Sequence, residues 1–328
     1  MPMKIIMKIC IIALLGMPAL MFSTNNSDAL SCTATISSPI NFGIVDTLGS
    51  TATHTQGLLT VTCSVTALDL GNLLLGIAIC PGVGNGSGGA STGTRLLTGP
   101  GGSLRYQIYS DANRQVPWGG YTGGLLFGDA PLFRMTAQVG TVSQSWPIYA
   151  SVPGQQNLTP GQYISTFSGT AGTQIRYGAL GSLLGCSSLG ATLSTTANFT
   201  VQATVSPKCN VLAPDNINFG TRGLLKNNVA AQGTVRLSCT QTTNYAVALE
   251  TGGVSPTARL MKNGANSVIY GLYKDSQHLQ PWGDAAGQTY SSAGTGTTTS
   301  IPVYGLVLPQ ATPPAGVYTD TVIVRITY

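Results

Sequence analysis

Apolar and polar residues alternate with a period of two along many short segments of this chain. In the last segment, residues 322–328, Val322, Val324, Ile326 and Tyr328 share one face of a strand. Short segments of this kind, separated by glycine-rich turns, are typical of a β-sandwich or a β-barrel. After residue 30, no long segment shows the 3.6-residue period of an amphipathic helix. The pattern therefore predicts an all-β protein.

The composition favours the same fold class. Charged residues make up 8% of the chain, hydrophobic residues make up 43%, and glutamate occurs once, at Glu250. Such a chain lacks the residues that usually cover helices, whereas Thr, Val, Ile and Tyr suit strands. The high apolar share argues against disorder. The net charge of +5 is scattered along the chain. We therefore expect no nucleic-acid partner.

The N-terminal residues follow a different pattern. Lys4 and Lys8 precede an apolar run, and small residues at positions 27 and 29 have the spacing that signal peptidase prefers. We interpret residues 1–29 as a signal peptide, so the protein is expected to be exported. A lipoprotein with lipid on Cys32 is the alternative, although many polar and small residues separate this cysteine from the apolar run.

The exported part contains one series of residues twice. The first copy contains Cys32, Asn41-Phe42-Gly43, Cys63, Tyr106, Trp118, Pro147 and Tyr163, and the second contains Cys209, Asn218-Phe219-Gly220, Cys239, Tyr270, Trp282, Pro302 and Tyr318. The tyrosine and the tryptophan are twelve residues apart in both copies. Conserved order and spacing indicate a duplicated domain, so features present in both copies are interpreted as structural, including both tryptophans.

Six cysteines remain after the signal peptide, and an even number in an exported chain indicates disulfides. The repeat predicts the equivalent bonds Cys32–Cys63 and Cys209–Cys239. Cys80 and Cys186 have no counterparts in the second copy, so we expect them to pair with each other. The alternative is that one of these two is free.

Candidate catalytic chemistry is sparse. The two histidines, His54 and His278, lie in no nucleophile or metal-binding motif. The acidic residues show no paired-carboxylate pattern of a glycosidase, and cysteines committed to disulfides leave no zinc cluster. We predict no enzymatic activity, no cofactor and no metal site.

The repeated residues resemble the spore coat U family. The resemblance rests on the early cysteine pair, the Asn-Phe-Gly motif, the blocks at 106–111 and 270–275 with the Trp-Gly that follows each, and the ending 315–328. This family includes subunits of archaic (Csu-type) chaperone–usher pili, and its two-domain members look like tip adhesins. The resemblance implies Ig-like, pilin-type sandwiches, and a pilin domain of this kind lacks its last strand. A periplasmic chaperone, and then the next subunit, supplies that strand. We expect an adhesin-type domain over residues 30–206 and a pilin-type domain over 207–328.

The first copy is followed by an additional alternating segment, residues 197–205. Its apolar face consists of Phe199, Val201, Ala203 and Val205. The segment lies just before Cys209, where an ordinary pilin would carry its donor strand. We predict that it completes the first domain within the same chain. The alternative is a linker that only resembles a strand.

The second copy is expected to stay one strand short, with an acceptor groove beside the strand that carries Val322, Val324, Ile326 and Tyr328. At the other end, only Leu30 and Ser31 would precede Cys32, which leaves no donor strand for a neighbour. A subunit that receives a strand but donates none is expected at the tip of a fibre.

Three added, glycine-rich regions of the first copy contain large apolar residues. They are Leu96 and Leu97 in the first region, Tyr121, Leu125, Leu126 and Phe127 in the second, and Leu180, Leu183 and Leu184 in the third. Clustered exposed apolar residues tend to mark interaction sites, so these residues are candidates for a surface-binding site. The alternative is that they fold back onto the sandwich and cap its core.

These observations predict a pilus tip adhesin that mediates attachment to surfaces and biofilm formation. It would pass through the periplasm to the cell surface. Its expected partners are a periplasmic pilus chaperone, an outer-membrane usher, the next pilin subunit, and an abiotic or host surface. One alternative is a structural spore-coat or fimbrial shaft subunit, which should carry a donor segment. Another is a glycan-binding lectin, which favours aromatic, acidic or amide side chains over Leu and Gly.

Overall fold

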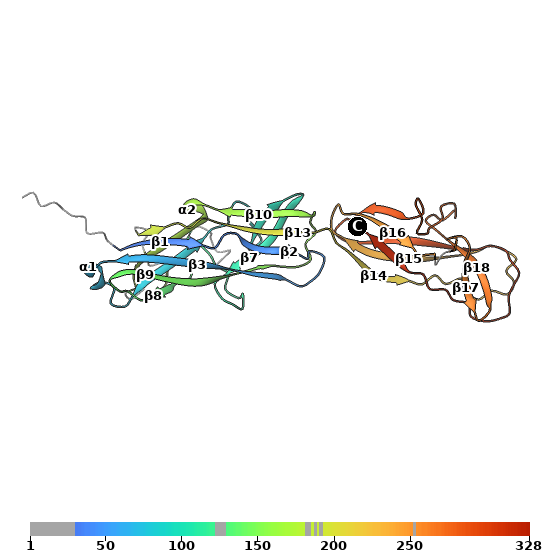
Figure 1. Ribbon diagram of the computed structural model, residues 1–328, viewed down its shortest axis with the longest axis horizontal. Coiled ribbons are helices and arrows are strands. Elements are labelled where there is room, and N and C mark those ends of the chain that lie inside the picture. Colours follow the sequence, from blue (N-terminus) through green and yellow to red (C-terminus); the bar gives the residue numbers. More distant parts are fainter. Residues whose placement is uncertain (1–29, 122–128, 181–184, 187–188, 190–192, 252–253) are drawn as a thin grey trace, which may run out of the picture.

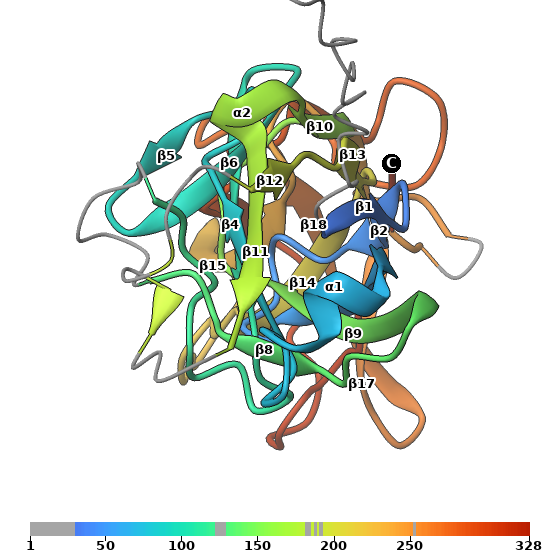
Figure 2. The same cartoon turned by 90° about the vertical axis from the view of Figure 1, so that its left-hand side faces the viewer.

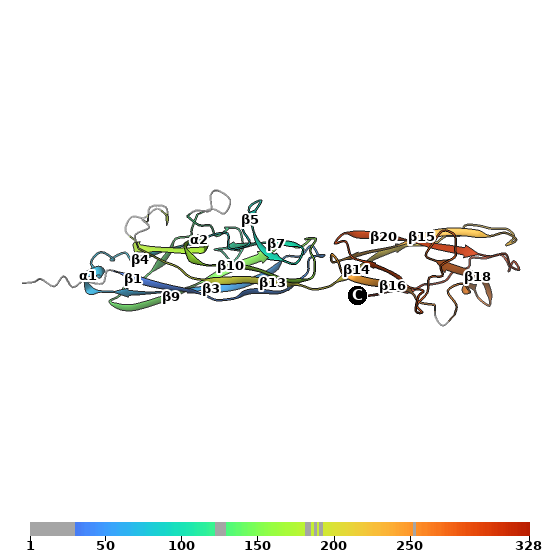
Figure 3. The ribbon, with the colours of Figure 1, turned by 90° about the horizontal axis from the view of Figure 1, so that it is seen from above.

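A computed structural model of the protein shows two β-sandwich domains that lie end to end (Figure 1, and from above in Figure 3). It describes residues 30–328 except 122–128, 181–184, 187–188, 190–192 and 252–253, so the expected signal peptide lies outside the described residues. Each domain has its own hydrophobic core. The all-β fold class is confirmed. Within the described ranges, no helix is long and apolar enough to cross a membrane.

The first domain is formed by a large curled sheet and a smaller one. Its strands are β1 (Ser31–Ile36), β2 (Ile40–Val45), β3 (Thr53–Val65), β4 (Ile77–Val83), β5 (Ala90–Ser91), β6 (Thr94–Gly99), β7 (Gly102–Tyr109), β8 (Phe133–Met135), β9 (Gly140–Val152), β10 (Gly161–Phe167), β11 (Thr173–Ala179), β12 (Ser194–Thr195) and β13 (Phe199–Val205). The large sheet has the order β1-β3-β9-β7-β6-β10-β13-β2, with β5 beside β6, and the smaller one has the order β12-β11-β4-β8. Two short helices are α1 (Ala67–Leu70) and α2 (Gly169–Gly172).

The second domain repeats this plan in a reduced form. Its strands are β14 (Cys209–Asp215), β15 (Val229–Cys239), β16 (Asn244–Leu249), β17 (Arg259–Asn263), β18 (Asn266–Tyr273), β19 (Tyr290–Ala293), β20 (Thr298–Val307) and β21 (Val324–Thr327). They form the sheets β14-β15-β20-β18-β17 and β19-β16-β21.

The strand β4 is buried on both faces, unlike most strands of the protein. Ile77 and Ile79 face the main core of the first domain, whereas Ala78 and Cys80 belong to a satellite cluster with Leu180. A strand covered on both sides needs no polar alternation, which explains the nearly continuous apolar sequence of β4.

Three disulfides join the six cysteines of the described chain. Cys32–Cys63 connects β1 to β3, and Cys209–Cys239 connects β14 to β15 at the equivalent position. Cys80–Cys186 ties β4 to the segment after β11. The sulfur of Cys32 is therefore bonded to another cysteine, which contradicts the lipoprotein alternative.

The two tryptophans anchor the same strands in both domains. The indole N–H of Trp118 donates to the carbonyl of Pro81 in β4 (2.6 Å), and that of Trp282 donates to the carbonyl of Val247 in β16 (3.0 Å). Both rings are almost completely buried. These contacts agree with a structural role and establish β4 and β16 as equivalent strands.

The domains contact each other through the loop between β9 and β10. The side-chain amide of Asn157 donates to the carbonyl of Thr295 (2.9 Å), and the N–H of Gln241 donates to the carbonyl of Leu158 (3.2 Å). Lys208 forms an ion pair with Asp46 across the junction. These contacts connect the first domain to the β15–β16 end of the second.

Removing the Cys80–Cys186 bond should destabilise the first domain alone. The bond spans 106 residues of sequence, and the loop-entropy relation assigns about 4–5 kcal/mol to a loop of roughly this length. We expect the variant Cys80→Ala/Cys186→Ala to lose about that much unfolding free energy in the transition of the first domain in a urea denaturation curve. The matched variant Cys209→Ala/Cys239→Ala should shift only the unfolding transition of the second domain. A shift of both transitions by the first variant would contradict independent domain cores.

Candidate functional site

The strand β13 occupies a slot between β10 and β2 in the first domain. It pairs antiparallel with β10 over its whole length and parallel with β2. Its four inward side chains are at most 3% exposed; they are Phe199, Val201, Ala203 and Val205. The structure thus places the segment expected to complete the first domain inside that domain, hydrogen-bonded on both sides. The alternative that this segment is only a linker does not agree with this pairing.

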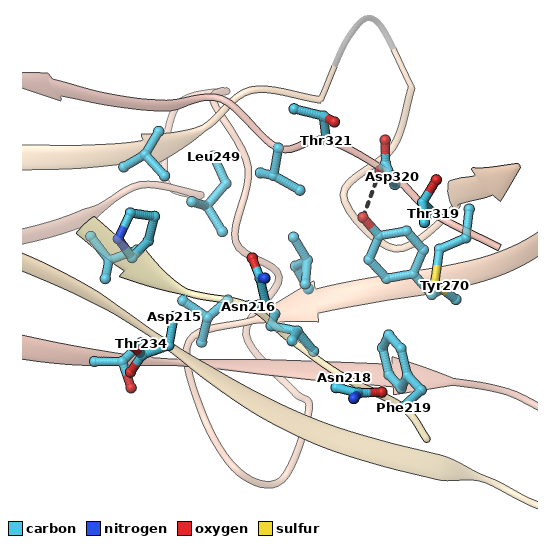
Figure 4. Close-up of a pocket in the computed structure, with 18 of the residues that line it drawn as sticks. Asp215, Asn216, Asn218, Phe219, Thr234, Leu249, Tyr270, Thr319, Asp320 and Thr321 are labelled. Carbon is cyan, nitrogen blue, oxygen red and sulfur yellow. Dashed lines mark hydrogen bonds between the residues drawn. The ribbon is translucent and has the colours of Figure 1, made fainter. Parts of the chain in front are cut away.

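The second domain has an open groove at the corresponding place (Figure 4). One wall is formed by residues 214–219, at the end of β14 and just after it. The other is formed by residues 317–322 and 324, which lead into β21. Its volume is about 570 Å³. The core side chains Val235, Leu272 and Val303 line it.

A shared tyrosine establishes that the groove and the slot are equivalent. The hydroxyl of Tyr163 in β10 donates to the carbonyl of Thr159 (2.8 Å), and the hydroxyl of Tyr318 donates to the carbonyl of Pro314 (2.7 Å). Each bond spans four residues, as in the tyrosine corner of Ig-like sandwiches. The groove wall around Tyr318 is therefore the counterpart of β10.

The Asn-Phe-Gly motif marks the opposite wall in both domains. The side-chain oxygen of Asn41 accepts from the N–H of Gly43, and Asn218 does the same for Gly220, both at 2.8 Å. Each glycine has a positive φ of about 70° (+67° and +74°), which explains the requirement for glycine at this bend. The segment around Phe219 is thus the counterpart of β2.

Side chains around the groove are more exposed than their counterparts around β13. Ile40, Phe42, Tyr163 and Phe167 are buried, whereas Ile217, Phe219, Tyr318 and Val322 are half-buried. The same positions are covered in one domain by β13 and open to solvent in the other. The groove is therefore a core position that lacks its covering strand among the described residues.

The backbone shows the same difference. β2 and β10 are strands, but residues 216–220 and 320–323 belong to no strand. One isolated bridge, Lys262↔Thr319, remains on this wall. Because the sequence motifs are shared, the strand conformation of β2 and β10 depends on the ladder that β13 provides. The two walls of the groove can each offer an unpaired backbone edge to an added strand.

The expected acceptor strand is only partly correct. Val322 and Val324 line the groove, and Ile326 packs against the core beyond it. Tyr328 is 57% exposed and lines a separate, shallow hollow. Sequence reasoning missed Asp320, which does line the groove. Continuing the alternation backwards from Val322 would have found it.

Three polar side chains meet on the groove wall. Oδ2 of Asp320 accepts a hydrogen bond from the hydroxyl of Tyr270 (2.6 Å) (Figure 4). The same oxygen accepts from Nε and Nη2 of Arg259 (both 3.1 Å). The Arg259 side chain is only 5% exposed, and the Asp320 side chain is 23% exposed. Burial, together with the hydrogen bond to Asp320, raises the pKa of Tyr270 to about 12. The tyrosine is therefore a neutral hydrogen-bond donor at neutral pH.

The first domain contains a counterpart of this arginine. Arg95 pairs with Tyr106 in register, as Arg259 pairs with Tyr270. Arg95 is fully buried, which lowers its pKa to about 10, and it donates to the backbone carbonyls of Gly84, Val83 and Trp118. Its side chain also contacts Oε1 of Gln107.

This equivalence corrects the prediction for the first added region. Leu96 and Leu97 belong to β6 and match Leu260 and Met261 of β17, so they are part of the shared scaffold. Leu97 is fully buried in the core and Leu96 is half-buried. Neither residue lies in a surface-binding loop.

The other described candidates also pack inward. The ring of Tyr121 lies 3.6 Å from the Arg176 guanidinium, and its hydroxyl donates to the carbonyl of Cys80. Leu180 is buried in the satellite cluster, and its N–H donates to the carbonyl of Gly76. The capping alternative therefore holds for these two residues. Leu125, Leu126, Phe127, Leu183 and Leu184 lie outside the described residues.

Part of the extra length of the first domain lies outside these three regions. Eighteen residues separate Cys63 from Pro81, but only eight separate their counterparts Cys239 and Val247. The added residues form α1 and the turn after it, at the end of the first domain farthest from the second (Figure 1; facing the viewer in Figure 2).

Three large apolar side chains of this segment are exposed to solvent. Leu68 is 76% exposed, Leu74 is 83% exposed and Leu75 is 68% exposed. Val139, in the loop that precedes β9, is 52% exposed, and Gly140 beside it pairs with Val65 just before α1. The distal end of the first domain thus presents an apolar surface that sequence reasoning missed. The length difference between the copies was its signal.

The fold holds this distal segment in place. Thr66 caps α1 by accepting from the N–H of Asp69, and the Asp69 carboxylate accepts from the N–H of Thr66. The hydrogen bonds from Thr66 lower the pKa of Asp69. Leu73 is buried in the core between the exposed leucines. The exposed side chains are therefore presented by an anchored segment.

Fold and groove together define a protein of two pilin-like sandwiches, one complete and one open. Two stretches of the chain, residues 20–170 and 195–325, match the Spore Coat Protein U domain. The chain belongs to this family. "Protein U" of Myxococcus xanthus is 30% identical over 151 residues, which cover 40% of this chain and 84% of that protein.

Two solved structures to which the chain is similar are complexes described as containing a tip subunit or tip adhesin. One is the complex of the chaperone CsuC and the tip adhesion subunit CsuE from archaic chaperone-usher Csu pili of Acinetobacter baumannii. It is 17% identical, with a TM-score of 0.48, and covers 90% of this chain and 100% of that chain. Another is a chaperone–tip adhesin complex of CFA/I fimbriae, 11% identical, with a TM-score of 0.31, covering 89% and 97%.

Replacing Phe199 with alanine should destabilise the first domain. This ring is buried and stacks on Phe167 with centroids 4.3 Å apart. Truncating a buried phenylalanine typically costs about 3–5 kcal/mol, so the first-domain transition in urea denaturation should shift by that amount. The control Thr204→Ala changes an exposed residue of the same strand and should leave the curve unchanged. Equal curves for both variants would show that β13 does not belong to the first-domain core.

Proposed function

We propose that this protein is the tip subunit of a surface fibre assembled by donor-strand complementation. The observation that carries the proposal is the contrast between the domains. The first domain has its slot filled by β13 of the same chain, whereas the second has an open groove with two unpaired edges. Such a subunit accepts a strand from one neighbour through the second domain.

The groove also implies a protected route to the surface. A strand-sized opening onto the core residues Val235 and Val303 is an aggregation hazard until it is covered. We infer that a periplasmic pilus chaperone covers it first, that an outer-membrane usher receives the complex, and that the strand of the next pilin subunit replaces the chaperone. The three disulfides suit this exported route.

The distal end of the first domain would make the attachment. It lies opposite the groove-bearing domain along the long axis, where the tip of a fibre meets a surface (Figure 3). The exposed leucines at positions 68, 74 and 75 can bury apolar area only by contact with something outside the domain. An abiotic or host surface with apolar character is the matching target, and attachment of many cells to it would support biofilm formation.

Replacing Leu68, Leu74 and Leu75 together with serine should weaken attachment to polystyrene several-fold, because the contact loses its apolar area. The loss should be smaller on clean glass, which is hydrophilic. Attachment is measured by counting bound cells that display equal amounts of fibre. The matched control replaces Leu224 and Leu279, which are exposed in the second domain, and should bind normally. Unchanged attachment of the triple variant would contradict the assignment of the distal end.

The position in the fibre can be tested separately by immunogold electron microscopy of surface fibres. A subunit whose open slot lies in its second domain should be labelled at fibre ends. Gold particles spaced along the shaft would contradict the tip position and favour a structural shaft subunit.

A further inference from the structure

Asp320 gives the groove a chemistry that the filled slot of the first domain does not have. Counting from the shared tyrosine, its counterpart is Ser165 of β10, which is fully buried and pairs with Val201 of β13. In the second domain this position carries a carboxylate on the groove wall (Figure 4). The next inward position is Phe167 in the first domain and Val322 in the second, so it is apolar in both. Along this wall, the two domains therefore differ in chemistry at one inward position, which is serine in the first domain and aspartate in the second.

The carboxylate is satisfied on one oxygen only. All three donors from Arg259 and Tyr270 reach Oδ2. Within the described part of the chain, no donor reaches Oδ1. While the groove is open, the partly exposed Asp320 side chain can be hydrated. A strand seated in the groove would cover it, and a buried carboxylate oxygen without a donor is costly.

The first domain provides the register for such a strand. Across the ladder, Phe167 faces Phe199, Ser165 faces Val201 and Tyr163 faces Ala203. Directly opposed side chains in an antiparallel pair lie close together on the same face. In the second domain, the residue of the incoming strand at the place of Val201 would therefore face Asp320.

We propose that Asp320 selects the incoming strand, and that this strand carries threonine or serine at the position facing Asp320. This inference rests on the proposed acceptor function of the groove. A hydroxyl donates a hydrogen bond to the carboxylate, and threonine keeps the branched shape of the valine in β13. A lysine fits less well, because Arg259 already balances the charge of Asp320.

Two further positions follow from the same register. The residue facing Tyr318 should be small, like Ala203, because the tyrosine is unchanged. The residue facing Val322 should be a large apolar residue, since valine fills less space than Phe167. The expected pattern, from N- to C-terminus, is large apolar, hydroxyl and small at alternate positions. The strand β13 of a second copy is a poor occupant, because its valine would face the carboxylate.

The test uses the full exported chain and three labelled peptides in fluorescence anisotropy titrations. The parent peptide has the sequence of residues 197–205, the second carries Val201→Thr, and the control carries Gln202→Thr on the outward face. The Val201→Thr peptide should bind roughly ten- to a hundredfold more tightly than the parent, the factor expected for one satisfied buried polar group. The control peptide should bind like the parent.

Two protein variants locate the effect. With Asp320→Ser, the preference for the threonine peptide should disappear. With Ile323→Ser, an exposed change in the same segment, it should persist. Equal affinity of the unmodified protein for the parent and Val201→Thr peptides would overturn the role of Asp320 and leave the acceptor function intact, even if Asp320→Ser does not fold. Binding of no peptide would contradict the acceptor function itself, and this inference with it.

Discussion

The backbone of a β-strand at the margin of a core needs a hydrogen-bonded neighbour, and this need governs both domains of the protein. In the first domain β13 pairs with β10 and β2, and all three become regular strands. In the second domain the equivalent segments around Phe219 and Tyr318 have no strand between them and belong to no strand themselves. Shared sequence motifs thus adopt different local structure because one ladder is complete and the other is not.

The buried arginines show how each domain adapts to this difference. Arg95 is fully buried and is held by backbone carbonyls and Gln107 in a closed core. Arg259 instead pairs with the Asp320 carboxylate on the wall of an open groove. A charged partner is tolerable there because solvent reaches it. This Asp320 carboxylate on the groove wall is the feature on which the proposed selection of the incoming strand rests.

Much of the fold follows from sequence patterns, because they reflect strong local constraints. The alternation in 197–205 predicts a buried face at Phe199, and the duplicated spacing identifies the scaffold and the cysteine pairs of each copy. These features depend on strand periodicity and repeated motifs, which a linear sequence displays directly.

The apolar surface at the distal end of the first domain was not predictable in the same way. Arg95-Leu96-Leu97 follows a glycine-rich run and resembles a loop, although its match to Arg259-Leu260-Met261 shows that it is a core strand. The exposed leucines of α1 and of the turn after it lie in a segment whose composition looks like core. Whether an apolar side chain points inward depends on what the tertiary fold places over it, and sequence composition does not contain that information.

Hydrogen exchange of the equivalent segments 161–167 and 316–322 in the full exported chain tests the contrast between the domains most directly. An occupied slot and an open groove predict slow exchange in the first segment and exchange faster by orders of magnitude in the second, because local opening governs protection. Equal, slow exchange in both segments would contradict an open second domain, and equal, rapid exchange would contradict the completion of the first domain by β13.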